Sequence, residues 1–315
     1  MSGPSSLKDA EFIELFKSVG PSETARTMGI TVRAVHRRRE RLEKRLGGQI
    51  SGPAHHQNTR RAEEHAQRIG LQVDTGTVFI GSDSHYWPGL VSTAHQGLLC
   101  LARDFKPKLI IKNGDVLDGA TISRHPPIGW EDRPKLIDEL DTVKERLAEI
   151  RDASPNSRFI WPLGNHDARY ETRLATLAPE FAKIHGFHLK DHFPEWEPCW
   201  SAWINEDAVV KHRFKGGIHA PWNNTIYAGR TMVTGHLHSQ KVMPFTDYNG
   251  TRWGVDAGTM ADPHGPQFEY LEDNPRNWRE GFCILTYRNG VLLQPELVRV
   301  HAPNVLDFRG ELINV

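Results

Sequence analysis

Asp, Asn and His residues recur in five short motifs along this chain, and each motif follows an apolar run. Carboxylate, amide and imidazole groups suit borderline divalent metal ions, and burying them without a partner would be costly. No cysteine lies in the motifs, which excludes a thiolate zinc site. The pattern therefore predicts a metal centre with oxygen and nitrogen ligands. The motifs are Asp83-Ser84-His85, Gly114-Asp115-Val116-Leu117-Asp118, Gly164-Asn165-His166-Asp167, Gly217-Ile218-His219 and Gly235-His236-Leu237-His238.

In this order the motifs resemble those of the calcineurin-like metallophosphoesterase superfamily, over most of residues 77–258, and the set looks like that of its DNA-repair exonuclease branch. The resemblance implies two divalent metal ions bridged by Asp115. We expect Mn²⁺ first, although Fe and Zn²⁺ accept the same ligands. The ligands implied are Asp83, His85, Asp115 and His238 for one ion, and Asp115, Asn165, His219 and His236 for the other.

The fourth motif leaves a choice between two histidines. His219 follows Gly216-Gly217 at the end of an expected strand, whereas His212 stands in the middle of the run. Because ligands gather at strand ends, we expect His219 to be the ligand and His212 to have no metal role.

Two ions about 3.5–4 Å apart can share a water molecule and lower its pKa, which provides a hydroxide near neutral pH. The alcohol that leaves a phosphate ester also needs a proton. The resemblance assigns this role to His166, with Asp118 orienting the imidazole ring. Asp167 is either a second orienting residue or a helix N-cap.

Several residues beside the motifs are candidates for the substrate pocket. Tyr86, Trp87 and Trp222 could stack on bases or serve as core packing and pocket wall. Arg124 and His125, soon after the second motif, could contact a phosphate or the leaving group, or simply belong to a surface loop.

The elements that must position these residues alternate between short apolar strands and helices from residue 76 onward. This pattern predicts an α/β fold with the site at the C-terminal ends of the strands. A hairpin around Arg288-Asn289-Gly290 adds antiparallel strands and makes the sheet mixed. The resemblance implies the four-layer α/β/β/α sandwich of the superfamily for residues 76–315.

The N-terminal residues 1–48 have a different composition. They predict helices over 9–18, 23–28 and 32–46 that resemble a helix-turn-helix of DNA-binding proteins, although Arg38 stands where an apolar residue is usual. Arg33, His36, Arg37 and Arg41 would form the DNA-contacting face. The alternative is an interaction or oligomerisation module with a solvated basic face. Residues 49–75 are expected to be a linker with a docking helix over 59–69.

The uneven distribution of charge suggests that the two parts of the chain have separate roles. Residues 1–70 carry 13 Lys and Arg against 8 Asp and Glu, whereas residues 71–315 carry 26 against 31. A basic appendage on a phosphoesterase suggests a nuclease or phosphodiesterase acting on DNA. The alternatives are a phosphomonoesterase or small-nucleotide phosphodiesterase with N-terminal helices for assembly, and a non-catalytic DNA-binding scaffold.

Composition excludes other classes. No run approaches 18 apolar residues, so no membrane span is expected, and the first seven residues lack the apolar core of a secretory signal. Three widely spaced cysteines, Cys100, Cys199 and Cys283, fit reduced thiols in a cytoplasmic protein. The sequence leaves homo-oligomer formation open.

Overall fold

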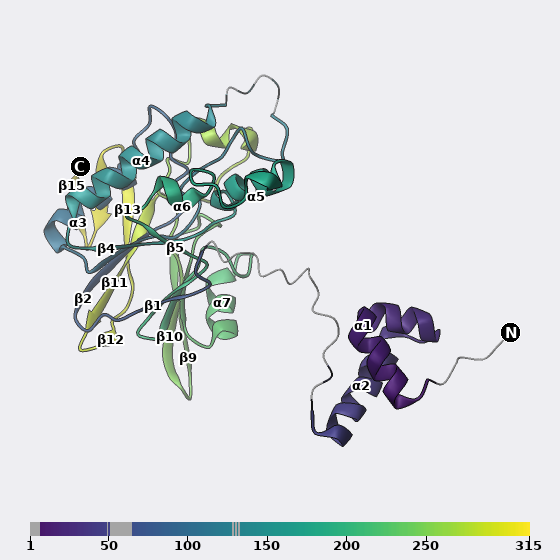
Figure 1. Cartoon of the computed structure of the whole chain (residues 1–315). Coiled ribbons are helices and arrows are strands. Elements are labelled where there is room, and N and C mark those ends of the chain that lie inside the picture. Colours follow the sequence, from purple (N-terminus) through teal and green to yellow (C-terminus); the bar gives the residue numbers. More distant parts are fainter. Residues whose placement is uncertain (1–6, 49, 51–64, 128, 130, 132) are drawn as a thin grey trace. The chain divides into compact units, whose positions relative to one another are not determined.

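The computed structural model describes residues 7–48, 50, 65–127, 129, 131 and 133–315 (Figure 1). It comprises two compact units, Met1–Glu64 and His65–Val315. Each unit has its own hydrophobic core. In the part of the chain that the structure describes, no helix is long and apolar enough to cross a membrane.

The small unit consists of helices α1 (Asp9–Met28) and α2 (Val32–Leu46). Gly20 has φ 77° and ψ 177°, so α1 is kinked there, between the two helices that the sequence predicted. α1 ends at Gly29, and the side chain of Thr31 accepts a hydrogen bond from the backbone N–H of Ala34 to cap α2. The resemblance of this helix pair to a helix-turn-helix remains a prediction.

Arg38 is the polar residue that departs from the helix-turn-helix pattern, and the structure accounts for it. Its Nη2 donates to the Leu7 carbonyl at 2.6 Å and lies 2.8 Å from Asp9 Oδ1. Its guanidinium carbon lies 4.6 Å from the centroid of the Phe12 ring. Arg38 therefore packs within the unit, against a core formed by Phe12, Phe16, Ala25, Met28, Val35, Leu42 and Ile50.

A nine-stranded mixed sheet forms one half of the large unit. Its order is β15-β14-β13-β11-β2-β3-β4-β5, and β12 pairs with β11. The strands β2 to β5 are parallel, whereas β11 to β15 are antiparallel to their neighbours, as the predicted C-terminal hairpin requires. The bounds are β2 (Gly76–Gly81), β3 (Leu109–Lys112), β4 (Arg158–Pro162), β5 (Glu197–Cys199), β11 (Gly281–Arg288), β12 (Val291–Leu292), β13 (Glu296–Ala302), β14 (Val305–Phe308) and β15 (Glu311–Asn314).

The other half is a six-stranded mixed sheet in the order β1-β6-β7-β8-β10-β9. Its strands are β1 (Ile69–Leu71), β6 (Ala202–Ile204), β7 (Ala208–Val210), β8 (Thr231–Thr234), β9 (Lys241–Asp247) and β10 (Gly250–Asp256). β1 pairs with β6, so residues that the sequence placed in the linker belong to this sheet. Of the expected docking helix, residues 59–64 lie outside the described residues. The remainder, 65–69, is not helical but leads into β1.

The layers run helix, sheet, sheet, helix, and the predicted mixed α/β architecture is confirmed. Helices α3 (Thr93–Phe105) and α4 (Leu136–Ala153) cover the outer face of the nine-stranded sheet, and α7 (Ala220–Ala228) covers the six-stranded sheet (Figure 1). Because side chains alternate along a strand, Phe79 of β2 packs in the helix-facing core, whereas its neighbours Val78 and Ile80 pack between the two sheets. The shorter helices are α5 (Asp167–Leu177), α6 (Leu189–His192), η2 (Pro179–Phe181) and η3 (Pro266–Leu271).

Candidate metal centre

The motif residues lie in the loops that follow β2, β3, β4, β7 and β8. Asp83 comes two residues after β2, His212 two residues after β7, and His236 two residues after β8. Asp115 and Asn165 come three residues after β3 and β4. The carboxyl ends of strands from both sheets thus supply one site, at the position where α/β folds place ligands.

Asp83, His85 and His238 form the first group of potential ligands. One ligand atom from each lies within 4.8 Å of the others, and all three side chains are buried. His238 Nε2 lies 3.0 Å from Asp83 Oδ1. This group contains three of the four residues expected for one metal ion.

Asp115, His212 and His236 form the second group under the same distance limit. His212 Nε2 lies 3.1 Å from Asp115 Oδ2 and 3.9 Å from Asp83 Oδ1. The two groups are therefore adjacent, and His212 lies between their carboxylates. His236 is exposed, so the second group opens toward solvent.

The structure places His212 in a group of potential metal ligands and His219 in none of the groups described, which differs from the preference drawn from the sequence. β7 ends at Val210, so His212 stands beyond the strand rather than within it. Its Nδ1 donates to the Asn113 carbonyl at 2.8 Å, and this leaves Nε2 facing the carboxylates. His219 is the exposed N-cap residue of α7.

The backbone of the site is held in an unusual conformation. Asp83, His85, Asp115, His236 and His238 all have positive φ, between 38° and 71°. Such a conformation is uncommon for residues other than glycine, and costs on the order of 1–3 kcal/mol where the surroundings enforce it. Strain of this kind concentrates at functional sites.

Neighbouring glycines allow the loops to approach the carboxylates closely. A Cβ atom at Gly164 would lie 2.1 Å from Asp115 Oδ1, and one at Gly235 would lie 2.4 Å from Asp83 Oδ2. Neither approach is compatible with a side chain, so both positions require glycine.

The charges of the group fit a site for cations. Burial raises the pKa of Asp83, but the facing His238 and His212 outweigh it and lower the pKa to about 2. Burial also opposes ionisation of Asp115, yet His212 and His166 hold its pKa well below the usual range. Burial lowers the pKa of His212, whereas Asp115 and Asp83 raise it to about 10. A cation bound here would displace that proton from His212.

Two buried atoms supply a further test of this fit. Within the part of the chain that the structure describes, Asn165 Oδ1 and His238 Nδ1 are buried and have no hydrogen-bond partner. Leaving such a group unpaired costs roughly 1–3 kcal/mol. A metal ion would satisfy Asn165 Oδ1, whereas His238 faces the ligand group through its other nitrogen, Nε2. The unpaired Asn165 oxygen therefore fits the expected ions.

His166 and Asp118, which the sequence predicted to be an acid and its orienting residue, lie together beside the two groups, and these roles stay predictions. Asp118 Oδ1 lies 2.9 Å from His85 Nδ1 and 3.2 Å from His166 Nδ1. Burial lowers the pKa of His166, but the carboxylates of Asp115 and Asp118 raise it above the ordinary value. Asp118 also orients the metal-ligand candidate His85, which leaves Nε2 of that ring free for an ion.

Asp167 has neither of its two expected roles. It is the first residue of α5 and is buried. Its carboxylate accepts hydrogen bonds from the backbone of Asp115 at 2.9 Å, the backbone of Gly164 at 2.8 Å and the indole of Trp161 at 3.0 Å. Asp167 therefore ties two ligand loops together.

A cavity of about 480 Å³ opens beside His166 and Asp118. Trp87 and His125, two of the predicted pocket residues, line it. Sequence reasoning missed Arg169, whose Nη2 donates to His166 Nε2 at 2.9 Å. The available signal was its position three residues after His166, which puts both on one face of a helix. The other lining residues include Arg133, Gln267 and Tyr270.

The remaining predicted pocket residues lie elsewhere. Tyr86 is buried, with its hydroxyl 2.8 Å from His95 Nδ1, so it is a core residue. Arg124 is exposed and does not line the cavity. Trp222 lies on α7, where its ring packs 5.1 Å from that of Phe245.

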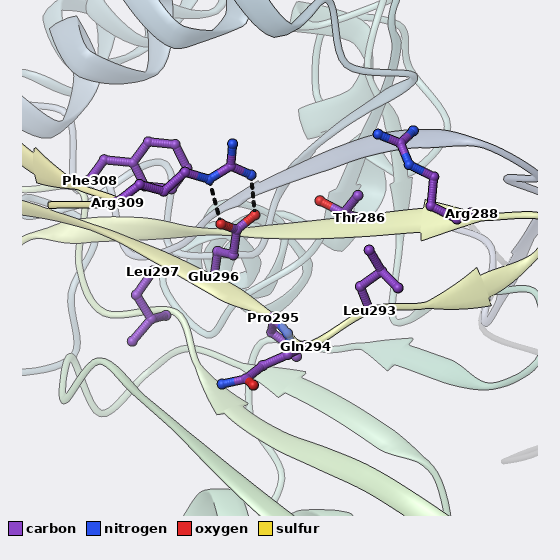
Figure 2. Close-up of a pocket in the computed structure, with 9 residues that line it drawn as sticks. All are labelled: Thr286, Arg288, Leu293, Gln294, Pro295, Glu296, Leu297, Phe308 and Arg309. Atoms are coloured by element: carbon purple, nitrogen blue, oxygen red, sulfur yellow. Dashed lines mark hydrogen bonds and ion pairs between the residues drawn. The ribbon is translucent and has the colours of Figure 1, made fainter. Parts of the chain in front are cut away.

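A second hollow, of about 630 Å³, lies over the C-terminal strands, away from these residues. Figure 2 shows Glu296 and Arg309 on its border, joined by two contacts of 2.6 Å. None of the described groups of potential metal ligands includes a residue of its lining. The cavity beside His166, by contrast, is lined by Asp118 and His166, which belong to such a group.

No protein-family model and no curated protein sequence matches this chain. Among solved structures, the chain is similar to a dimetal phosphatase from Danio rerio, with 10% sequence identity and a TM-score of 0.32. The similarity covers 75% of this chain and 99% of that one. A TM-score and an identity this low do not support a conclusion about function. The function of the chain therefore depends on the geometry of its own site.

Proposed function

We propose that this protein is a dinuclear metal-dependent phosphoesterase that hydrolyses phosphodiester bonds, with DNA as its substrate. The observation that carries the proposal is the pair of adjacent ligand groups, joined at His212, next to the His166–Asp118 pair. Buried carboxylates, imidazoles and an acid in one place are what metal-assisted hydrolysis needs.

Asp83, His85 and His238 would hold one ion, Asn165, His212 and His236 the other, and Asp115 both. Two divalent ions held there would activate a water molecule and offset charge on the phosphate oxygens. Mn²⁺ is the first candidate, because the ligands are oxygen and nitrogen donors.

His166 is suited to protonate the leaving oxygen. Its Nδ1 lies 2.8 Å from the Asp118 carbonyl oxygen, so Nε2 is the nitrogen available to substrate. Arg169 donates to this Nε2 and also to the Asp118 carbonyl at 2.9 Å. A phosphate oxygen that attracts the Arg169 guanidinium would free Nε2 to carry the proton.

The small unit supports DNA as the substrate class. Arg33, Arg37 and Arg41 are exposed on α2, while His36 is half-buried beside them. Attachment to a polyanion raises the effective concentration of the catalytic unit at DNA. The second candidate, a phosphomonoesterase or small-nucleotide phosphodiesterase, is favoured by the limited volume of the cavity and by the acidic excess of residues 71–315.

A substrate panel tests the proposal. The purified protein with Mn²⁺ is given p-nitrophenyl phosphate, bis(p-nitrophenyl) phosphate, cyclic and linear nucleotides, and single- and double-stranded DNA, each with an EDTA control. We expect hydrolysis of the diester and of DNA. Diester hydrolysis with DNA left intact would favour the second candidate, and no metal-dependent hydrolysis of any ester would contradict both.

A further inference from the structure

Residues 208–246 form the segment between Asp207 and Asp247 and contain no Asp or Glu. They contain Lys211, Arg213, Lys215, Arg230 and Lys241, although residues 71–315 as a whole carry more acidic than basic side chains. This one segment therefore has a positive charge that its own sequence does not neutralise.

Aromatic side chains share the surface of this segment. Phe214 is 45% exposed and Tyr227 is 68% exposed, so both rings face solvent. Lys215 Nζ lies 4.6 Å from the centroid of the Tyr227 ring and 5.6 Å from that of Phe214. Lys211 Nζ lies 5.8 Å from the Phe214 centroid. Among the described residues these two lysines contact rings and form no ion pair with a carboxylate, which leaves their charge available.

The structure holds this surface in place. The backbone N–H of Lys215 donates to Asn224 Oδ1 of α7 at 2.9 Å. Lys241 Nζ, at the start of β9, donates to the Ile218 carbonyl at 3.3 Å. The loop is thus tied to α7 and β9, and we define the aromatic–basic surface as Lys211, Phe214, Lys215, Tyr227 and Lys241.

The loop that carries Phe214 and Lys215 begins at His212 of the second ligand group. The same acid-free segment continues to His236 and His238. His236 is exposed, whereas the cavity with His166 involves residues from other loops. A polynucleotide bound at the second ligand group could therefore also contact the loop that follows His212.

We propose that the aromatic–basic surface binds the single-stranded stretch of polynucleotide that flanks the scissile phosphate. This inference rests on the proposed action on DNA. Lysines would contact phosphates, and the rings of Phe214 and Tyr227 would stack on bases, which is how proteins bind single strands without sequence preference. The absence of acidic residues from the segment favours a polyanion over an apolar protein partner.

The test measures binding of a fluorescein-labelled, single-stranded oligonucleotide to the full chain in EDTA, by fluorescence anisotropy at several salt concentrations. Every protein compared also carries Arg33→Ala and Arg37→Ala, so that the small unit contributes less to oligonucleotide binding. Lys215→Glu/Lys241→Glu should raise Kd about tenfold. It should also reduce the salt slope, the change of log binding constant per unit of log salt concentration, by about 1.4, since each phosphate contact contributes about 0.7. Phe214→Ala/Tyr227→Ala should raise Kd about tenfold with little change of slope.

The matched control is Arg103→Glu/Lys144→Glu, which reverses two charges on α3 and α4, in the helix layer over the other sheet. It should leave Kd within about twofold. Lys215→Arg/Lys241→Arg should also retain binding, and equal melting temperatures across the variants establish that each one folds. Equal Kd values for the surface variants and the control would overturn the proposal.

The outcomes separate this inference from the proposed function, because binding is measured without metal and without hydrolysis. Loss of binding in the surface variants, with no DNA cleavage by the unaltered protein in Mn²⁺, would keep the surface and reject the nuclease. DNA cleavage by the unaltered protein, with unchanged oligonucleotide binding in the surface variants, would support the nuclease and reject the binding surface. A dimer that Phe214→Ala/Tyr227→Ala dissociates, without any change in Kd, would assign the surface to a second copy of the chain and overturn the inference.

Discussion

The two units use charged residues in opposite ways. On α2 of the small unit, Arg33, Arg37 and Arg41 are exposed. In the large unit, Asp83, Asp115 and His212 are buried against one another. An exposed charge acts mainly through net charge and is tolerant of its position, whereas a buried charge depends on each partner. Substitutions should therefore have small, graded effects in the first unit and large effects in the second.

The largest effect is expected for Asp115→Ala. Asp115 belongs to one ligand group, contacts His212 of that group and lies near His166. Its loss should remove metal from both groups and lower kcat/KM by about 10⁴-fold, because metal-assisted stabilisation is worth several kcal/mol. Metal analysis together with diester hydrolysis measures both. Retention of two ions per chain by the variant would contradict the bridging role.

His166→Asn should lower kcat by about 10³-fold for esters with poor leaving groups, and far less for nitrophenyl esters, because only the former need an acid. The pKa of His166 is raised above its ordinary value of 6.5, so the protonated form persists to higher pH. Activity should therefore fall as pH rises through that higher pKa. A pH profile of kcat measures this fall of activity at high pH. The same fall in the His166→Asn variant would exclude His166 as the acid.

His212→Ala and His219→Ala form a matched pair on one loop. His212 lies 3.1 Å from Asp115, whereas His219 is exposed at the N-terminus of α7. The first substitution should lower metal content and reduce activity on the order of 10²-fold, and the second should change neither. Inductively coupled plasma mass spectrometry measures the metal content of each variant. A metal loss confined to His219→Ala would restore the preference drawn from the sequence.

Gly235→Ala and Gly48→Ala compare a glycine of each unit. A Cβ at Gly235 would lie 2.4 Å from Asp83 Oδ2, while one at Gly48 would have nothing within 4 Å. We expect the first to lower the free energy of unfolding by about 1–3 kcal/mol and to weaken metal binding. The second should be close to neutral. Urea denaturation gives both values, and equal stabilities would mean that the loop at Gly235 can relax.

The smallest effects are expected in the small unit, where Arg37 and Arg38 are neighbours. Arg37→Ala should weaken binding to duplex DNA a few-fold and lower the salt slope by about 0.9, without changing stability. Arg38→Ala should lower the melting temperature of the unit, because Arg38 contacts Leu7, Asp9 and Phe12. Anisotropy and thermal melting measure the two effects. If Arg38→Ala weakened DNA binding and Arg37→Ala lowered the melting temperature, Arg38 would belong to the DNA-binding face.

Much of the site could be predicted because ligands at strand ends leave a local signal. Asp83, Asp115, Asn165 and His236 each follow the end of a strand by two or three residues. That spacing places the side chain beyond the sheet whatever the rest of the chain does. The alternation of strands and helices gave the mixed α/β fold for the same reason, since burial of each run requires a sheet with covered faces.

The failures share a different physical cause. The choice between His212 and His219 depends on where a strand ends and which way its next residue points. The same orientation decides whether Tyr86 and Trp87 pack in the core or line a pocket, which the sequence left open. Tyr86 turns into the core toward His95, while Trp87 lines the cavity. The expected helix over 59–69 had a polar helical pattern, yet its described part leads into β1 beside β6. Pairing with a strand more than 130 residues away is not written in local periodicity.

The amino-acid sequence by itself determined most of the side chains that could bind metal, the order along the chain of the strands that carry them and the basic character of the first unit. Only the tertiary structure decided that His212 joins Asp115, that Arg169 contacts His166 and that Lys215 contacts the exposed ring of Tyr227. The reason is that ligand identity is a property of each residue, whereas a site is a set of distances between loops. Those distances are set by the packing of two sheets, to which every part of the large unit contributes.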